Sequence, residues 1–176
     1  MKMKLLRKSY KVLVATAVLG FSGCMDLSET FYSQLSKDNF YNNRVEVMQG
    51  VLRPFTHMQA WLAPTGQNGF YYHSEMAADQ VAWPQKGRHG FDGGDHIRLH
   101  YHTWTPDEPR MRNAWSLMWE GVGYVNAILE DLETLDITKA NLTEEDRQKL
   151  IAEVKVMRAY HYMRIMDMWG NVPIIT

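Results

Sequence analysis

The chain has 176 residues, of which 45% are hydrophobic and 22% charged, and its formal net charge is −1 with histidine neutral. Five of its 19 basic residues precede Cys24, so the remainder carries 14 basic and 20 acidic residues, a net charge of −6. This balance excludes the basic surface that nucleic-acid binding requires, and a single cysteine excludes an intrachain disulfide.

Residues 1–23 have the order of a secretion signal. Basic residues come first, an apolar stretch follows over residues 12–21, and the small pair Ser22 and Gly23 ends the segment. An apolar run of about 10 residues is too short to cross a hydrocarbon core, which needs about 20. We therefore expect residues 1–23 to be a signal peptide that is removed.

Cys24 directly follows the small pair, an arrangement that resembles the bacterial lipobox. Phe21 departs from that pattern, in which leucine is usual three places before the cysteine. The resemblance implies that the mature protein begins at a lipidated Cys24, since two or more acyl chains anchor a protein stably. Residues 24–35, rich in Ser, Thr and acid, would be the lipidated tether. The alternative role for Cys24 is a small buried thiol.

A first helix is predicted over about residues 37–62. Ser36 is a suitable N-cap, and apolar residues follow it near helical spacing: Phe40, Val47, Val51 and Leu52. Pro54 is expected to break or kink this helix, which residues 55–62 would resume.

Between Pro64 and Pro109 the apolar periodicity disappears, and glycine, proline, histidine and aromatic residues dominate. Such a long irregular stretch is usually functional or disordered, and its aromatic content favours ordered loops. The run from Asp92 to Asp95 contains two glycines but lacks the oxygen-ligand series of an EF-hand. We therefore expect a glycine turn there.

Two further helices are predicted after Pro109. The first has a stripe of apolar residues at steps of three and four: Met111, Trp115, Met118, Val122, Val125, Leu129 and Leu132. The second would start at a capping box of Thr143 and Asp146 and end at Gly170. Because a short connection joins them, these helices should pack antiparallel as a hairpin.

Two stretches of these helices resemble the SusD/RagB family of Bacteroidetes surface lipoproteins. Residues 115–129, with Trp115, Trp119 and Asn126, are similar to the family's tryptophan-to-asparagine helix. Residues 152–173 contain Ala-Glu, then Arg158-Ala159, and end in Gly-Asn-Val-Pro, like the family's second motif. The intervening loop and the start at Cys24 also agree with the family.

The resemblance implies an all-α fold, a tetratricopeptide-type helical platform with a long irregular loop insertion. Residues 36–176 would be an incomplete N-terminal domain, because family members run to several hundred residues. It also implies a non-enzymatic protein of the outer membrane, lipid-anchored and facing outwards. Such proteins capture oligosaccharides and deliver them to a SusC-type TonB-dependent transporter, without a cofactor. The alternative is a helical scaffold that binds a protein partner and no sugar.

Glycan capture needs exposed aromatic rings for stacking and polar groups that hydrogen-bond hydroxyls. The irregular stretch offers Tyr72, Trp83, Arg88, His89 and Asp92 as candidate glycan-binding residues. Trp83 is the best platform because the following proline stiffens the loop. The alternative is that Trp83 fills the core of the loop.

Other conspicuous residues are assigned structural roles. Trp115, Trp119 and Tyr124 are expected to pack between helices, and Arg158 to satisfy buried carbonyls or a carboxylate. Three histidines, His96, His100 and His102, suggest a lipoprotein metalloenzyme, but spacings of four and two share no face of a helix or a strand. We predict no metal site, and no nucleophile or paired-carboxylate motif predicts a catalytic residue.

Overall fold

The computed structural model describes residues 40–63 and 68–176 of the chain. These residues form three long helices and three short helical segments, and none of them belongs to a strand. The segments, in chain order, are α2 (Arg44–Leu62), α3 (Phe70–Met76), η1 (Asp92–Gly94), α4 (Asp95–His100), α5 (Pro109–Thr134) and α6 (Glu144–Trp169). The predicted all-α fold class is confirmed.

The predicted signal peptide (1–23) and tether (24–35), with Cys24, lie outside the described residues. Among the helices that are described, none is both long enough and apolar enough to cross a membrane.

Helix α2 begins at Arg44, so the predicted start near Lys37 is wrong. The Asn43 side chain accepts a hydrogen bond from the Glu46 amide at 3.0 Å, and the Glu46 carboxylate accepts one from the Asn42 amide at 2.8 Å. This reciprocal pairing satisfies amide groups that the first turn leaves free. Ahead of it, Tyr41 has a φ of 63°, which a continuing helix does not allow. The hydrogen bond from the Asn42 amide also lowers the pKa of Glu46.

Pro54 lies inside α2, which continues to Leu62, so of the predicted break or kink the break does not occur. A proline removes one backbone donor from a helix, but buried residues on both sides of Pro54 pack into the core. Val47 and Val51 precede it, and Trp61 follows it. Packing against α5 therefore holds both halves of α2 in one helix.

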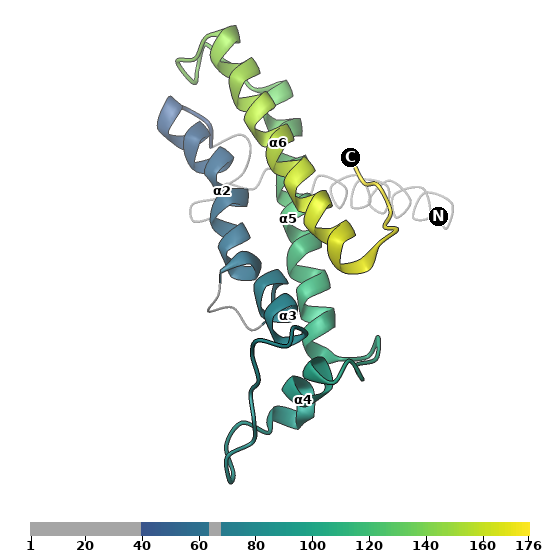
Figure 1. Ribbon diagram of the computed structural model, residues 1–176. Helices are drawn as coiled ribbons and strands as arrows, with labels where there is room; N and C mark the ends of the chain where they lie inside the picture. The colour runs from purple at the N-terminus through teal and green to yellow at the C-terminus, as the bar shows by residue number, and fades with distance from the viewer. Residues whose placement is uncertain (1–39, 64–67) are drawn as a thin grey trace, which may run out of the picture. The chain divides into compact units, whose positions relative to one another are not determined.

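Helices α5 and α6 run antiparallel and contact each other along their length, which confirms the predicted hairpin (Figure 1). Pro109 begins α5, where a missing amide proton costs nothing. Thr143 and Asp146 form the predicted capping box of α6. Gly170 ends α6 with a φ of 73°, a conformation that favours glycine.

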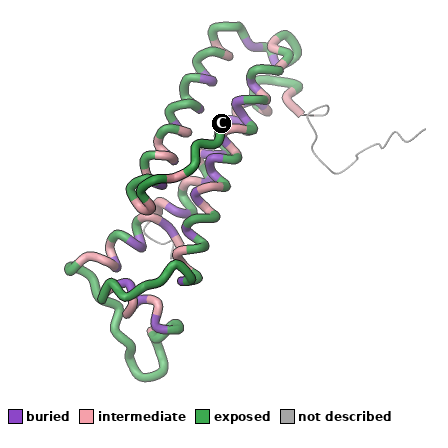
Figure 2. Tube along the Cα trace, turned by 90° about the vertical axis from the view of Figure 1, so that its right-hand side faces the viewer, coloured by how far each residue is buried: buried purple, intermediate pink, exposed green. Residues whose placement is uncertain are grey.

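The core lies between α2, α5 and α6 (Figure 2). One cluster joins Val47 and Val51 of α2 to residues from Val125 to Met157 of the hairpin. A second cluster lies nearer the end of the hairpin and contains Trp61, Met118, Val122 and Ile165. As predicted, Trp119 and Tyr124 pack between helices: the Trp119 ring lies 5.8 Å from that of Tyr162, and the Tyr124 ring 4.9 Å from that of His57.

Residues 171–176 form an extended segment beyond α6 that is fixed at Ile175. The Tyr162 hydroxyl donates to the Ile175 carbonyl at 2.8 Å and accepts from the Ile175 amide at 2.6 Å. Asn126 donates to the same carbonyl at 3.0 Å, and its amide oxygen accepts from Arg158 at 3.1 Å. Of the predicted carbonyl or carboxylate acceptors, Arg158 thus contacts a carbonyl oxygen, that of the Asn126 side-chain amide. The motif residues Asn126 and Arg158 serve to hold this segment.

The described part of the stretch before Pro109, residues 68–108, is not entirely irregular. It contains α3, η1 and α4. The expected glycine turn is present, since Gly93 and Gly94, the last two residues of η1 before α4, have φ values of 69° and 82°.

Candidate functional site

Residues 81–91 form an exposed hairpin in the segment that leads from α3 to η1 (Figure 2). This segment contains most of the predicted glycan-binding residues. Two backbone hydrogen bonds close it, Lys86 amide to His89 carbonyl at 2.8 Å and His89 amide to Lys86 carbonyl at 3.0 Å. Gly87, the first central residue of the turn, has a φ of 60°. A two-residue hairpin turn of this kind requires glycine there. The turn places Lys86, Arg88 and His89 at the tip.

Trp83 lies at the base of the 81–91 hairpin and is 46% exposed. Its ring stacks on that of His96, with centroids 4.9 Å apart and planes at 15°. Gly90 closes the base from the other side of the turn, where a Cβ would lie 3.0 Å from the Pro84 carbonyl oxygen and 3.1 Å from Trp83 Nε1. Trp83 is thereby held against a fixed support while half of its surface remains open.

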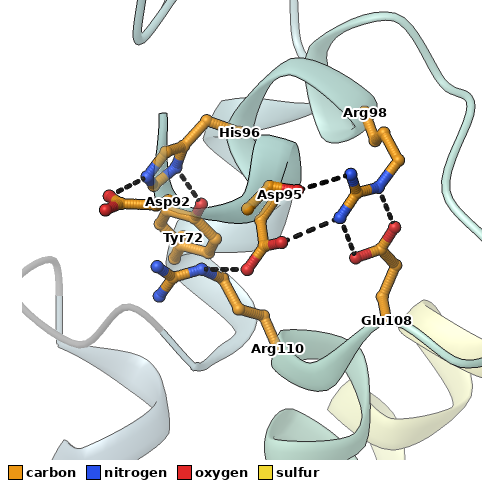
Figure 3. Close-up of polar contacts among 8 residues, drawn as sticks. Tyr72, Asp92, Asp95, His96, Arg98, Glu108 and Arg110 are labelled. Atoms are coloured by element: carbon orange, nitrogen blue, oxygen red, sulfur yellow. Dashed lines mark hydrogen bonds and ion pairs between the residues drawn. The ribbon is translucent and has the colours of Figure 1, made fainter. Parts of the chain in front are cut away.

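His96 is buried and is fixed by hydrogen bonds at both ring nitrogens (Figure 3). Its Nε2 lies 2.9 Å from an Asp92 carboxylate oxygen, and its Nδ1 is hydrogen-bonded to the Tyr72 hydroxyl. Tyr72 comes from α3, so this chain of contacts joins α3, η1 and α4. The imidazole under Trp83 therefore has one orientation.

Arg98 fixes α4 to the start of α5 (Figure 3). Its guanidinium forms a two-pronged ion pair with Glu108, one of whose contacts measures 2.8 Å, and also donates to Asp95 at 2.8 Å. A third nitrogen donates to the Gly93 carbonyl at 2.8 Å. Arg110 completes the network by donating to Asp95 at 3.0 Å. Such bidentate, charge-assisted pairs are among the stronger polar contacts in proteins.

The surroundings of Glu108 and Tyr72 shift the pKa values of both side chains. The hydrogen bond from Arg98 lowers the pKa of Glu108, so this carboxylate remains charged at neutral pH. Burial raises the pKa of Tyr72 to about 12, which keeps its hydroxyl protonated and able to donate to His96. Both effects favour the arrangement that supports Trp83.

Two clefts adjoin this region. A cleft of about 270 Å³ lies beside Trp83 and is lined by Trp83, Pro84, Gln85, His96, His100 and Tyr101. A larger cleft of about 630 Å³ lies where the start of α5 meets the end of α6, and its aromatic lining residues are Trp104, Trp115 and Trp169. Both clefts combine aromatic surface with polar groups, which is typical of ligand sites.

Four of the five predicted glycan-binding residues belong to this exposed region. Trp83, Arg88 and His89 are exposed on the hairpin, and Asp92 follows it with a side chain 48% exposed. Tyr72 differs, because it is only 7% exposed and its ring lies under the Arg110 guanidinium. Tyr72 supports the site through His96 and offers no open ring face to a sugar.

Other residues of the region were not predicted as site residues. Tyr101, 70% exposed, lines the cleft beside Trp83, and Lys86 stands at the tip of the hairpin. Trp115 packs against Trp169 as predicted, with centroids 5.2 Å apart, but it is also 38% exposed in the larger cleft. The position of Lys86 could have been predicted from the sequence, because the glycine that follows it indicates a turn.

Two of the three histidines considered as metal ligands have hydrogen-bond partners that differ from each other. His96 contacts Tyr72 and Asp92, whereas His102 contacts the Ala77 carbonyl at 2.6 Å. Across residues 40–63 and 68–176, no three His, Cys, Asp or Glu side chains are grouped to hold a metal ion.

Comparison with known proteins agrees with the helix motifs. The model of the SusD-like family, described as starch-binding and associating with the outer membrane, matches residues 32–176. The chain belongs to this family. A "SusD-like protein" of Bacteroides ovatus (strain ATCC 8483) is 21% identical over 173 residues, which cover 98% of this chain. The match spans 30% of that relative's length. No solved structure matches significantly. The predicted SusD/RagB resemblance is thus confirmed.

Proposed function

We propose that this SusD-like chain binds oligosaccharide and delivers it to a SusC-type TonB-dependent transporter of the outer membrane. The family's description as starch-binding supports a role in binding rather than catalysis. The function would belong to a lipoprotein anchored at Cys24 and facing the outside of the cell, as the order of residues 1–24 indicates.

The observation that carries this proposal is the support of Trp83. Its indole ring is half-exposed and rests on His96, whose position is fixed by Asp92 and Tyr72. Sugars stack on aromatic side chains through the apolar face that their C–H groups form. An aromatic side chain that is already fixed loses little entropy when a sugar stacks on it. The polar side chains of the hairpin would then hydrogen-bond the sugar hydroxyls.

Calorimetric titration of the purified protein with a panel of oligosaccharides tests the proposal. We expect Trp83→Ala to weaken binding about tenfold or more, because it removes the stacking surface. Val156→Ala, an exposed substitution on α6, is the control and should leave binding unchanged. If the parent and Trp83→Ala bound sugar with equal affinity, Trp83 would not be part of the sugar-binding site.

The alternative is a scaffold that binds the transporter without sugar. It is favoured by apolar side chains exposed along α6, of which Val156, Met163 and Met166 are 71%, 50% and 56% exposed. Pull-down of the transporter with and without added oligosaccharide separates the two functions. Transporter binding together with no detectable affinity for any sugar of the panel would favour the scaffold.

A further inference from the structure

We propose that the 81–91 hairpin selects an anionic oligosaccharide, one that carries uronic-acid carboxylates or sulfate esters. The inference rests on the proposed function, since it names the class of sugar that the Trp83 site would take. Lys86 and Arg88 are the residues that would contact the negative group.

The charge of the hairpin is opposite to that of the chain around it. Residues 80–91 contain Lys86, Arg88 and no acid, whereas the chain from Cys24 onward has a net charge of −6. Two acids, Asp79 and Asp92, flank the hairpin at its base, and Asp92 is engaged with His96. The positive charge is therefore concentrated at the tip, away from the acids.

The two cations at the tip have no acidic partner in the described part of the chain. Neither Lys86 nor Arg88 takes part in an ion pair there, and both are exposed. Arg98 and Arg110, at the base, are instead paired with Glu108 and Asp95. The cations at the base thus stabilise the fold, whereas those at the tip remain available to a ligand.

The hairpin connects these cations to the stacking surface. Lys86 lies three positions after Trp83, so extended backbone places them about 10 Å apart. The closing hydrogen bonds between Lys86 and His89 fix the turn, so Arg88 stands at the same end. An oligosaccharide that stacks one ring on Trp83 could therefore place a charged ring further along against Lys86 and Arg88. Neutral starch offers only hydroxyls for that second contact and no negative charge.

The stacking contact and the ionic contacts should respond differently to salt. Stacking on Trp83 is nearly independent of ionic strength, whereas contacts with exposed Lys86 and Arg88 are screened by salt. Each exposed ion pair contributes modestly, so we expect the two together to strengthen binding about tenfold at low salt. The preference for anionic sugars should therefore shrink as salt is added.

Calorimetric titration with three probes at 20 and 300 mM NaCl tests the inference. The probes are an oligogalacturonide, which carries carboxylates, a sulfated galactan oligosaccharide, and a neutral maltooligosaccharide. We expect one of the anionic probes to bind about tenfold more tightly than the neutral one at low salt. The double variant Lys86→Gln/Arg88→Gln should lose this preference and its salt dependence, yet keep its far-ultraviolet circular dichroism spectrum.

The matched control removes two positive charges elsewhere. Lys149→Gln/Lys155→Gln changes net charge equally on α6 and should keep the preference for the anionic probe. Neutral sugar bound as tightly as the anionic probes, with sensitivity to Trp83→Ala, would overturn the anionic selectivity and keep the proposed function. Absence of binding to all three probes and to the wider panel would overturn both.

Discussion

Gly121 of α5 lies against His161 of α6, and this contact sets how closely the two helices approach. A Cβ at Gly121 would come within 3.0 Å of His161 Nε2 and Cδ2. The imidazole is fully buried, and its Nδ1 is bonded to the Met157 carbonyl at 2.9 Å. It therefore has no space into which it can move. Burial also lowers the pKa of His161, which favours the neutral ring.

We expect Gly121→Ala to lower the free energy of unfolding by about 1–3 kcal/mol, the usual cost of overpacking a core. Urea denaturation followed by circular dichroism at 222 nm measures it. The control is Gly123→Ala on the same helix, where no atom lies within 4 Å of the added Cβ. Gly123→Ala should stabilise by about 0.5–1 kcal/mol through helix propensity. Equal effects of the two substitutions would contradict close packing at Gly121.

The Glu108 carboxylate gives the support of the site a pH dependence. Its pKa is lowered from an ordinary 4.5 by Arg98, so the folded state favours the charged form. A group with a depressed folded pKa contributes its stability above its unfolded pKa and loses it as the pH falls through the folded value. The contribution of Glu108 is therefore complete near neutral pH and disappears in acid.

Comparing Glu108→Gln with the parent isolates this contribution. We expect a lower urea midpoint for Glu108→Gln at pH 7, and a difference from the parent that shrinks as the pH falls below about 4.5. The other carboxylates titrate in both proteins and cancel in the difference. Urea titrations at half-unit steps from pH 3 to 7 measure it, and a difference constant over this range would be inconsistent with the Arg98 pair.

The segment after α6 shows how the family's helix motifs act at the level of an element. Arg158 orients Asn126, and Asn126 and Tyr162 together hold the backbone of Ile175. Three side chains from two helices thus fix one residue of an extended segment. The sequence pattern predicted where α6 ends, but the partners of these side chains become visible only when the segment folds back.

Tyr162→Phe should release Ile175 without disturbing the helices. The substitution removes the hydroxyl that bonds both the amide and the carbonyl of Ile175, but keeps the ring that contacts Trp119. We expect the Ile175 amide to exchange with solvent about fivefold faster, the effect of losing one hydrogen bond. Hydrogen exchange followed by nuclear magnetic resonance measures it, with the amide of Ile165 in the core as the internal reference. An unchanged rate at Ile175 would show that other contacts hold the segment.

The long helices were predictable because their signals are local and repeated. Apolar steps of three and four marked α5 and α6, and Thr143 with Asp146 marked the start of α6. The start of α2 was missed although Asn43 and Glu46 carry the same kind of capping signal. Helices α3 and α4 have seven and six residues, too few for an apolar period to be recognised.

At the scale of the molecule, the candidate site depends on contacts between residues distant in the chain. Trp83 and Tyr72 are both aromatic residues of a stretch without periodicity, so the sequence offers no means to tell which is buried. In the structure, the two residues contact His96 in different ways. The Tyr72 hydroxyl is hydrogen-bonded to Nδ1 of His96, whereas the Trp83 ring stacks on the imidazole face. The sequence predicted Trp83 as a stacking surface, and Trp83 is exposed, but the sequence did not predict its support.

Membrane attachment is proposed for Cys24 and sugar binding for the 81–91 hairpin. A substitution at Cys24 tests whether the two functions are independent. Two or more acyl chains at Cys24 would hold the protein at the membrane, since each buried methylene contributes about 0.8 kcal/mol. We expect Cys24→Ser to move the protein from the membrane fraction to the soluble fraction of lysed cells. Sugar affinity of the purified protein should stay unchanged, because the 81–91 hairpin is distant from Cys24 in the sequence. Ser22→Ala keeps a small residue before the cysteine and should leave the protein in the membrane fraction. Retention of Cys24→Ser in the membrane fraction, under conditions that strip peripheral proteins, would contradict lipidation at this residue.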